Sequence, residues 1–176
     1  MLFSKTLQEH VTAGARGFLV CTHEEERILE EIKRAFKKRR FLQWSSVDGL
    51  LNGNSSMIPA DQGLVGALQA LYELQSEKPW VAVVLDSHEH LNPKAKRLVR
   101  QLINKDEGVI LLVGPADEVP LELTKSLVVL SYNLPTEEML LHEVAECKKL
   151  KTSEDERVVL AEATKGLTLA EARIQL

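Results

Sequence analysis

The chain has 176 residues and a formal net charge of −4 at pH 7, and 44% of its residues are hydrophobic while 27% are charged. These values are typical of a globular protein and exclude a disordered or fibrous class. The apolar runs VAVVL and VILLV have five residues each, whereas a helix that spans a membrane needs about 20. We therefore expect one main domain with a sizeable core and room for a small appendage.

Composition also bears on compartment and partners. Residues 1–16 are too polar for a signal peptide and two cysteines do not indicate a disulfide framework, which predicts a cytoplasmic protein without a membrane partner. The negative net charge argues against general nucleic-acid binding. The basic segment KRAFKKRR at 33–40 ends a predicted helix, where positive charge favours the negative end of the dipole. A patch that binds anions or nucleic acid is the alternative.

Short apolar runs alternate with amphipathic stretches along the first part of the chain. The predicted strands are 17–22, 41–46, 80–86, 108–113 and 127–131, and the predicted helices are 24–38, 62–76, 92–104 and a short turn at 120–126. The runs at 80 and 108 lack apolar/polar alternation, which is typical of strands covered on both faces. Five strands with four crossovers predict an α/β fold with a parallel, doubly wound sheet. Segment 48–63 is predicted to be a long loop.

After the fifth strand, the pattern predicts helices only. One begins behind Pro135 with Thr136 as its cap and extends through 150, and another begins at Ser153 and stops at Gly166. A third opens with a capping box from Thr168 to Glu171. This last helix is short where the sequence ends, so we expect a piece of a longer polypeptide.

Polar residues that follow the predicted strands are the candidates for function, because ligands of open α/β sheets bind beyond the carboxyl ends of the strands. Phosphate capture at the first strand-to-helix turn needs glycine amides and a lysine, but the sequence has no G-x-x-x-x-G-K-[ST]. Thr22 and Glu25 have capping-box spacing, and Glu24, Glu25 and Glu26 suit the positive end of the helix dipole. This turn is therefore predicted to be closed to phosphate.

The segment VAVVLDS reads like a Walker B strand that ends in Asp86, a residue type suited to holding Mg²⁺ through water. Ser87 stands where a glutamate would polarise an attacking water. The structural alternative is that Asp86 caps or hydrogen-bonds a neighbouring loop.

Histidines near the same strand ends raise a metal alternative. His88 and His90 flank Glu89 in DSHEH, and His23 follows the first strand; imidazoles and carboxylates are ligands for Zn²⁺. No C-x-x-C or H-E-x-x-H motif anchors such a site. In the expected strand order, His23 and His88 leave strands separated by a third, so their backbones are about 10 Å apart.

Three further side chains have mainly structural interpretations. Cys21 and His23 could form a thiol and base pair, but the sequence shows no group that would activate the thiol, so a structural cysteine is preferred. Trp44 and Trp80 are interpreted as core or partly covered residues.

In this order, the elements resemble an AAA ATPase module. VVLDS resembles a Walker B strand, VILLVGPADEVPLEL the sensor-1 strand and following loop, LSYNLPTEEML the passage into the lid, and LAEATKGLTLAEA the lid helices. More narrowly, the chain resembles the N-terminal, P-loop-lacking domain of Ycf-type AAA proteins of bacteria and plastids. THEEERILEEI, WSSVDGL, the segment from LDSHEHL to KRLVRQL, and KGLTLAEA carry this resemblance.

The resemblance implies a three-layer RecA/AAA-like P-loop-NTPase fold, with a degenerate α/β domain at 1–133 and a partial helical lid at 134–176. It places Asp86 at the Walker B aspartate and Asp117 roughly at the sensor-1 polar position, while Thr22 to Glu25 replace the P-loop. A second AAA module with working Walker motifs would follow, and ATP and Mg²⁺ are expected as cofactors of that parent protein.

Three hypotheses follow for function. The first is a non-catalytic domain for assembly, partner recognition or regulation of the attached ATPase module, in a homo-oligomer or with another protein. The second is a module that binds ATP weakly through Asp86. The third is a metal-dependent hydrolase built on His23, Asp86, His88 and His90.

Segment 48–63 lies where related ring ATPases extend a loop toward their pore. Its apolar residues, Leu50, Leu51, Met57 and Ile58, could contact a partner there. The preferred alternative is that they tuck under the sheet.

Overall fold

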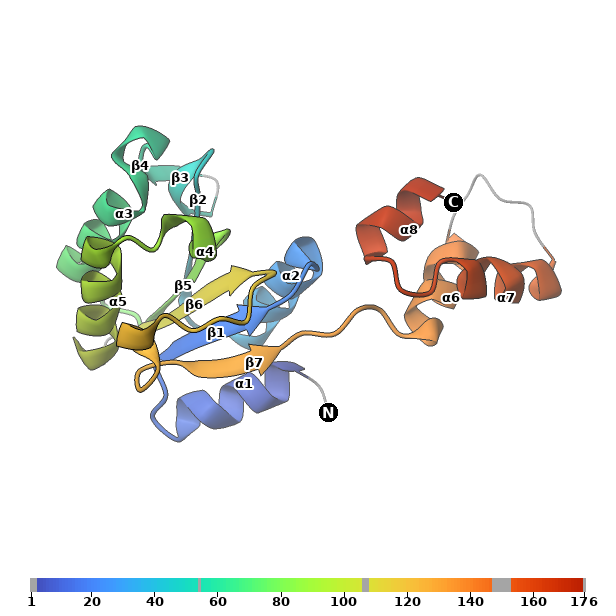
Figure 1. Ribbon diagram of the computed structural model, residues 1–176, viewed down its shortest axis with the longest axis horizontal. Helices are drawn as coiled ribbons and strands as arrows, with labels where there is room; N and C mark the ends of the chain where they lie inside the picture. Colours follow the sequence, from blue (N-terminus) through green and yellow to red (C-terminus); the bar gives the residue numbers. More distant parts are fainter. Residues whose placement is uncertain (1–2, 54, 106–107, 147–152, 176) are drawn as a thin grey trace. The chain divides into compact units, whose positions relative to one another are not determined.

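The computed structural model describes residues 3–53, 55–105, 108–146 and 153–175. It divides into two compact units, Met1–Tyr132 and Asn133–Leu176, which are described separately below (Figure 1). None of the helices in these described ranges is long and apolar enough to cross a membrane.

The first unit is built around a mixed seven-stranded sheet with the order β4-β3-β2-β5-β6-β1-β7. Its strands are β1 (Gly17–Cys21), β2 (Arg40–Ser45), β3 (Gly49–Asn52), β4 (Ser55–Ile58), β5 (Trp80–Val84), β6 (Gly108–Gly114) and β7 (Val128–Ser131). The five strands β2, β5, β6, β1 and β7, in this order across the sheet, pair in parallel. Strand β3 pairs antiparallel with β2 and with β4. The expected five-stranded parallel sheet is therefore too small, because a hairpin extends it.

This hairpin, β3 and β4, corrects the prediction of a long loop at 48–63. Gly53 takes a positive φ of 59° in the connection, a conformation that glycine adopts without a steric penalty. Leu50 is fully buried, and Met57 and Ile58 pack against the same core. Leu50, Met57 and Ile58 thus lie in the core as preferred, whereas Leu51 is partly exposed and belongs to neither core cluster of the sheet. A hairpin forms here because pairing with β2 supplies backbone hydrogen bonds that local sequence does not reveal.

Two helical layers cover the two faces of the sheet (Figure 1). Helices α3 (Gly63–Glu73) and α5 (Pro93–Lys105) cover one face, and α1 (Phe3–Thr12) and α2 (Glu25–Ala35) cover the other. Adjacent residues of β1 alternate between the cores, since Phe18 packs on the α1 and α2 side and Leu19 on the α3 and α5 side. Helix α1 was not predicted, and only Leu7 and Val11 of its residues are buried.

Short helical turns complete this unit. Helix α4 (Ser87–His90) follows β5 at once, and the predicted turn at 120–126 is the 3₁₀ helix η2 (Leu121–Leu123). Helix α4 lies where the chain leaves the carboxyl edge of the sheet, whereas η2 lies on the connection that leads into β7. Of these two, α4 therefore belongs to the region in which ligands of such sheets bind.

The second unit consists of helices α6 (Glu137–Glu146), α7 (Glu154–Ala163) and α8 (Leu169–Gln175) around a small core of its own. A capping box opens α8 at Thr168 and Glu171, as predicted. Helix α7 begins behind Ser153 as predicted, and Ser153 and Glu156 form a capping box there too. Thr136 accepts from the Met139 amide at 3.4 Å, so it caps α6. The predicted end of that first helix, at 147–150, lies outside the described residues.

Candidate functional site

The carboxyl ends of β5, β6 and β1 lie next to one another, with β6 in the middle. Thr22 follows β1, Asp86 follows β5, and Pro115 follows β6. Two contacts hold the ends of β1 and β6 together: the Thr22 amide donates to the Gly114 carbonyl at 2.9 Å, and the Cys21 thiol donates to the Pro115 carbonyl at 3.2 Å. The structure thus gathers the predicted strand-end residues at one edge and separates β1 from β5 by one strand, as expected.

The turn between β1 and α2 is filled by its own side chains. Thr22 and Glu24 are each only 4% exposed. The Thr22 hydroxyl accepts a hydrogen bond from the Glu24 amide at 2.9 Å. The Glu24 carboxylate lies 3.7 Å from Arg27 Nη1 in a nearly buried ion pair. The Glu24 carboxylate and its cationic partner Arg27 are thus enclosed within this turn.

The predicted capping box from Thr22 to Glu25 is wrong. Helix α2 begins at Glu25, so Glu24 is its N-cap, and the Glu24 side chain makes no capping hydrogen bond. Thr22 lies one residue too early to serve as a cap, and its hydroxyl bonds the Glu24 amide instead. The turn is therefore filled by buried side chains and an ion pair. Contrary to the prediction, Thr22 and Glu25 do not satisfy the free amides of α2 as a capping box.

Arg27 belongs to a polar network that sequence reasoning missed. Its Nε donates to the Tyr132 hydroxyl at 2.9 Å, and that hydroxyl donates to Glu31 at 2.8 Å. The Arg27 guanidinium also lies 4.5 Å from the centroid of the Tyr132 ring. Burial, followed by the hydrogen bond to Glu31, raises the pKa of Tyr132 to about 12. The spacing of Arg27 and Glu31 on one helix face was visible in the sequence, but Tyr132 reaches them only through the pairing of β7 with β1.

Glu25 and Asp86 act on each other across the strand edge. Burial raises the pKa of the Glu25 carboxyl, and the negative charge of Asp86 raises it further. Glu25 lies in the first turn of α2, and Asp86 lies two residues after the end of β5. Two carboxylates within electrostatic reach destabilise each other's ionised forms. Sequence reasoning assigned Glu25 to capping and did not foresee this pair.

Asp86 has the backbone of a sharp turn. It takes a left-handed conformation with φ 49° and ψ 32° and precedes α4, but its side chain makes no capping hydrogen bond. It is the one non-glycine residue with positive φ in the described ranges, and such strain often occurs at functional sites or turns. Asp117, in contrast, is exposed in the loop after β6.

The histidines do not converge. His23 is exposed on the β1–α2 turn, whereas the ring of His90 stacks edge-on against Trp44 with centroids 5.1 Å apart. His88 lies over the end of β6, where a Cβ on Gly114 would be 2.9 Å from its Nδ1. Within the described parts of the chain, no group of three or more His, Cys, Asp or Glu side chains could hold a metal ion. The geometry therefore gives no support to the metal hypothesis.

Other side chains named from the sequence have structural roles. Trp44 and Trp80 are 1% and 3% exposed and lie in the core, as predicted. Cys21 is a free thiol that is partly exposed and bonded to the backbone after β6. The basic segment ends α2, with Lys33 and Arg39 placed over the rings of Phe41 and Phe36.

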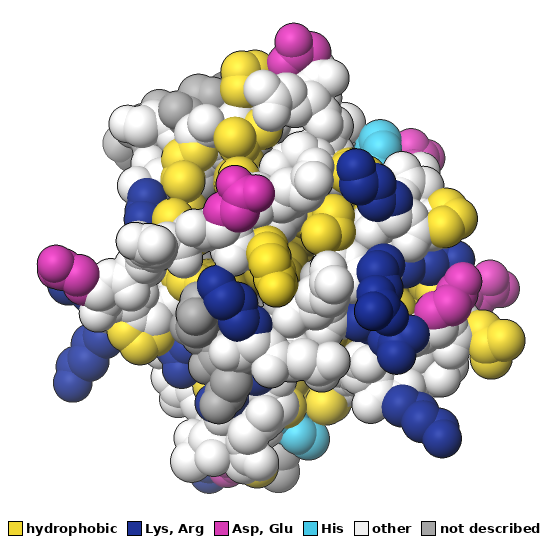
Figure 2. Space-filling model, turned by 90° about the vertical axis from the view of Figure 1, so that its left-hand side faces the viewer, with side chains coloured by type: hydrophobic (Ala, Val, Ile, Leu, Met, Phe, Trp, Pro, Cys, Tyr) yellow, Lys and Arg dark blue, Asp and Glu magenta, His cyan; other side chains and the backbone are white. Residues whose placement is uncertain are grey.

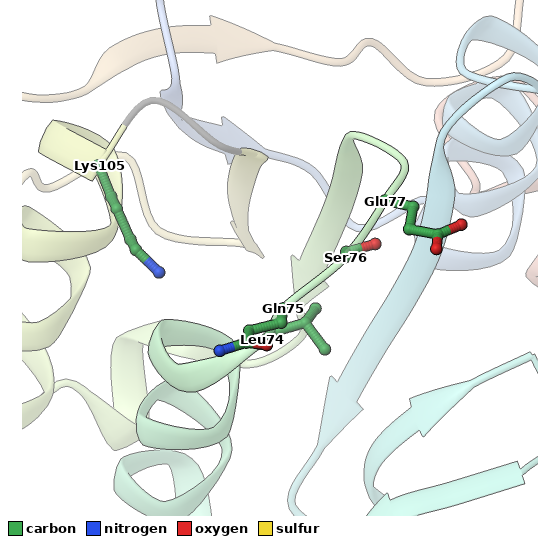
Figure 3. A pocket seen from close by; sticks show the side chains of 5 residues that line it. All are labelled: Leu74, Gln75, Ser76, Glu77 and Lys105. Atoms are coloured by element: carbon green, nitrogen blue, oxygen red, sulfur yellow. The ribbon is translucent and has the colours of Figure 1, made fainter.

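A cavity of 650 Å³ lies away from these strand ends (Figure 3). It is lined by Leu74, Gln75, Ser76, Glu77 and Lys105, which precede β5 or end α5. Figure 3 shows the Glu77 carboxylate and the Lys105 ammonium far apart, with no polar groups converging on one point. Lys105 donates to the Tyr72 carbonyl at 2.8 Å. The cavity therefore lacks the convergent polar groups that orient a small ligand.

Comparison with known proteins supports the family that the order of motifs in the sequence indicated. The family model of the SpoVK-like AAA ATPase, N-terminal domain, matches residues 3–132, which is more than half of the chain. An uncharacterized AAA domain-containing protein, ycf46, from Trieres chinensis is 26% identical over 130 residues. The match covers 70% of this chain and 26% of that protein, so the chain spans about a quarter of its curated relative. The chain belongs to the SpoVK-like AAA ATPase N-terminal domain family, as an N-terminal AAA domain of the Ycf type.

Proposed function

We propose that this chain is a non-catalytic N-terminal domain of a larger AAA-family ATPase. It serves assembly, partner recognition or regulation of an attached module that binds ATP and Mg²⁺. The second unit, Asn133–Leu176, acts in this proposal as part of a helical lid. The name of the family, which describes an N-terminal domain of an AAA ATPase, supports the existence of such a module.

The observation that carries the proposal is the side-chain-filled turn between β1 and α2. A P-loop binds phosphate because bare glycine amides converge on the anion and a lysine reaches its outer oxygens. Here the turn is Thr22-His23-Glu24-Glu25, and Glu24 is buried against Arg27. A triphosphate would meet the negative charges of Glu24 and Glu25 together with Asp86, so these residues do not fit ATP.

The residues after β5 also favour a role without hydrolysis. Ser87 follows Asp86 and is only 1% exposed, so no carboxylate stands at the position that would polarise an attacking water. The alternative, a module that binds ATP weakly, would use Asp86 and Asp117. Asp86 is partly buried and its charge acts on Glu25, and Asp117 is exposed in its loop. We therefore expect these two carboxylates to contribute little to the binding of a magnesium-bound nucleotide.

Isothermal titration of the full chain with Mg²⁺-ATP tests the proposal. The expected result is no saturable heat, because the acidic turn repels the phosphates. The Asp86→Asn variant serves as the matched control, because it removes one of the acidic charges from the same edge. Saturable heat that disappears in this variant would replace the proposal with the weak ATP-binding alternative.

A further inference from the structure

Helix α5 carries a positive charge that contrasts with the rest of the molecule. Its 13 residues, PKAKRLVRQLINK, include five lysines and arginines and no acidic residue, whereas the whole chain has a net charge of −4. Lys94, Arg97 and Arg100 are exposed and follow one another at a spacing of three residues, which places them along one side of a helix. We call these three residues the α5 basic stripe. Figure 2 shows Lys and Arg side chains gathered on the side of the molecule to which α5 belongs.

The core does not require this charge. Ala95, Val99 and Leu102 form the buried side of α5, and the α5 basic stripe lies away from it. None of the three stripe residues forms an ion pair within the described parts of the chain, although the charge of Arg100 helps to lower the pKa of Glu122. The other basic residues of α5 are engaged, since Lys96 lies 3.2 Å from Glu122 and Lys105 donates to Tyr72.

The stripe also opposes helix stability. Lys94 lies in the first turn of α5, where the positive end of the helix dipole disfavours a cation. Like charges three residues apart repel each other on a helix surface. Glu122 offsets part of this charge through its electrostatic interaction with Arg100. Lys94 and Arg97 form no ion pair within the described structure, so an anionic partner would relieve both effects.

Apolar side chains next to α5 indicate the class of that partner. Leu121 of η2 is 85% exposed, and Tyr72 of α3 is 40% exposed. The ion pair between Lys96 and Glu122 ties η2 to α5, and Lys105 lies over the Tyr72 ring, so both residues adjoin the helix. Nucleic acids are bound mainly through contacts with their phosphates, and such contacts would leave the Leu121 side chain uncovered. A mixed basic and apolar surface instead fits an acidic protein segment that also carries apolar residues.

We propose that the α5 basic stripe, together with Leu121 and Tyr72 on the elements that adjoin α5, binds an acidic segment of a partner protein that bears leucine-like side chains. This inference deepens the partner-recognition role proposed above and rests on it. Carboxylates of the segment pair with Lys94, Arg97 and Arg100, and its apolar side chains cover Leu121. The charge pairs also make the binding dependent on salt.

The test measures the binding of a short fluorescein-labelled amphipathic peptide of glutamate and leucine to the full chain by fluorescence anisotropy. Combining Lys94→Gln, Arg97→Gln and Arg100→Gln is expected to weaken binding about tenfold or more, and added salt to weaken binding to the unaltered chain. The matched control combines Arg34→Gln, Lys37→Gln and Lys38→Gln, which removes the same charge from three exposed residues at the end of α2. It is expected to bind like the unaltered chain.

Several outcomes would overturn the inference. They are the absence of saturable peptide binding, equal weakening in both triple variants, or tighter stripe-dependent binding of a single-stranded DNA of similar length. Thermal unfolding of the stripe variant is expected at the same temperature as that of the unaltered chain or higher, which excludes misfolding as the cause of weaker binding. The single variant Arg97→Gln gives a second measure of the contribution of the stripe to peptide binding. Titration with Mg²⁺-ATP reports separately on the proposed function. A failure of the peptide-binding inference can therefore be distinguished from a failure of the proposed function.

Discussion

The carboxyl of Glu25 gives the sharpest pH-dependent prediction at the scale of one residue. Burial and then the charge of Asp86 raise its pKa above the ordinary value of 4.5. Between the ordinary and the raised pKa, the folded chain holds a proton that the unfolded chain has lost, so stability falls as pH rises through this range. Above the raised pKa, the ionised Glu25 destabilises the fold.

Replacing Glu25 by glutamine removes this penalty. We expect Glu25→Gln to be more stable than the unaltered chain at pH 7, by no more than about 1 kcal/mol because water screens the partly exposed pair. Urea denaturation of both proteins across the acidic pH range measures the effect. The contributions of the other carboxyl groups cancel in the difference between the two free energies of unfolding. A constant difference from acid to neutral pH would contradict the assignment.

Tyr132 gives a second prediction at this scale. Its hydroxyl accepts from Arg27 at 2.9 Å and donates to Glu31 at 2.8 Å. Tyr132→Phe leaves both groups without this partner in a partly buried place, so we expect a loss of about 1–3 kcal/mol in the free energy of unfolding. Urea denaturation measures the loss.

The control for this prediction is Tyr72→Phe. Tyr72 is 40% exposed, and its hydroxyl makes no hydrogen bond within the described residues. We expect its removal to change stability by less than about 0.5 kcal/mol. Equal losses in the two variants would mean that the network around Arg27 contributes nothing of its own.

At the scale of elements, the pairing of β5 with β6 depends on a residue without a side chain. Gly108 pairs with Trp80, and a Cβ on Gly108 would collide with the Trp80 indole. Because Trp80 is only 3% exposed, the ring has little room to move. Gly108→Ala is therefore expected to cost about 1–3 kcal/mol through overpacking.

Gly114→Ala, at the other end of β6, is the matched control. Its Cβ would lie 2.9 Å from the imidazole of His88, an exposed side chain that can rotate away. We expect a loss below about 1 kcal/mol. Tryptophan fluorescence during urea denaturation measures both variants, and a larger loss for Gly114→Ala would show that the fit against Trp80 does not limit the sheet.

The elements also show where local patterns fail. Gly, Asn and Ser between residues 48 and 63 indicate a loop, yet β3 and β4 form there because β2 offers an edge for antiparallel pairing. Helix α1 was missed for a similar reason, since it buries Leu7 and Val11 against the sheet and α2. In both places, long-range packing outweighs weak local propensity.

At the scale of the whole molecule, the two units have separate cores. Two clusters fill the faces of the sheet in Met1–Tyr132. A third cluster, centred on Leu140, Val144, Ala161 and Ala172, lies within Asn133–Leu176. Arg173 joins α8 to α6 through hydrogen bonds of 2.7 and 2.9 Å to Glu143. Each unit is therefore held together by contacts of its own.

The sequence by itself determined the parallel strands, the main helices, the missing P-loop and the family, because apolar runs, capping residues and motif order are local features. Only the tertiary structure decided that the sheet has seven strands, that Glu24 is buried against Arg27 and that the charge of Asp86 acts on Glu25. These contacts join residues of different elements, or depend on the residue at which α2 begins. Their energies come from burial and charge in the folded chain, and no local pattern records them.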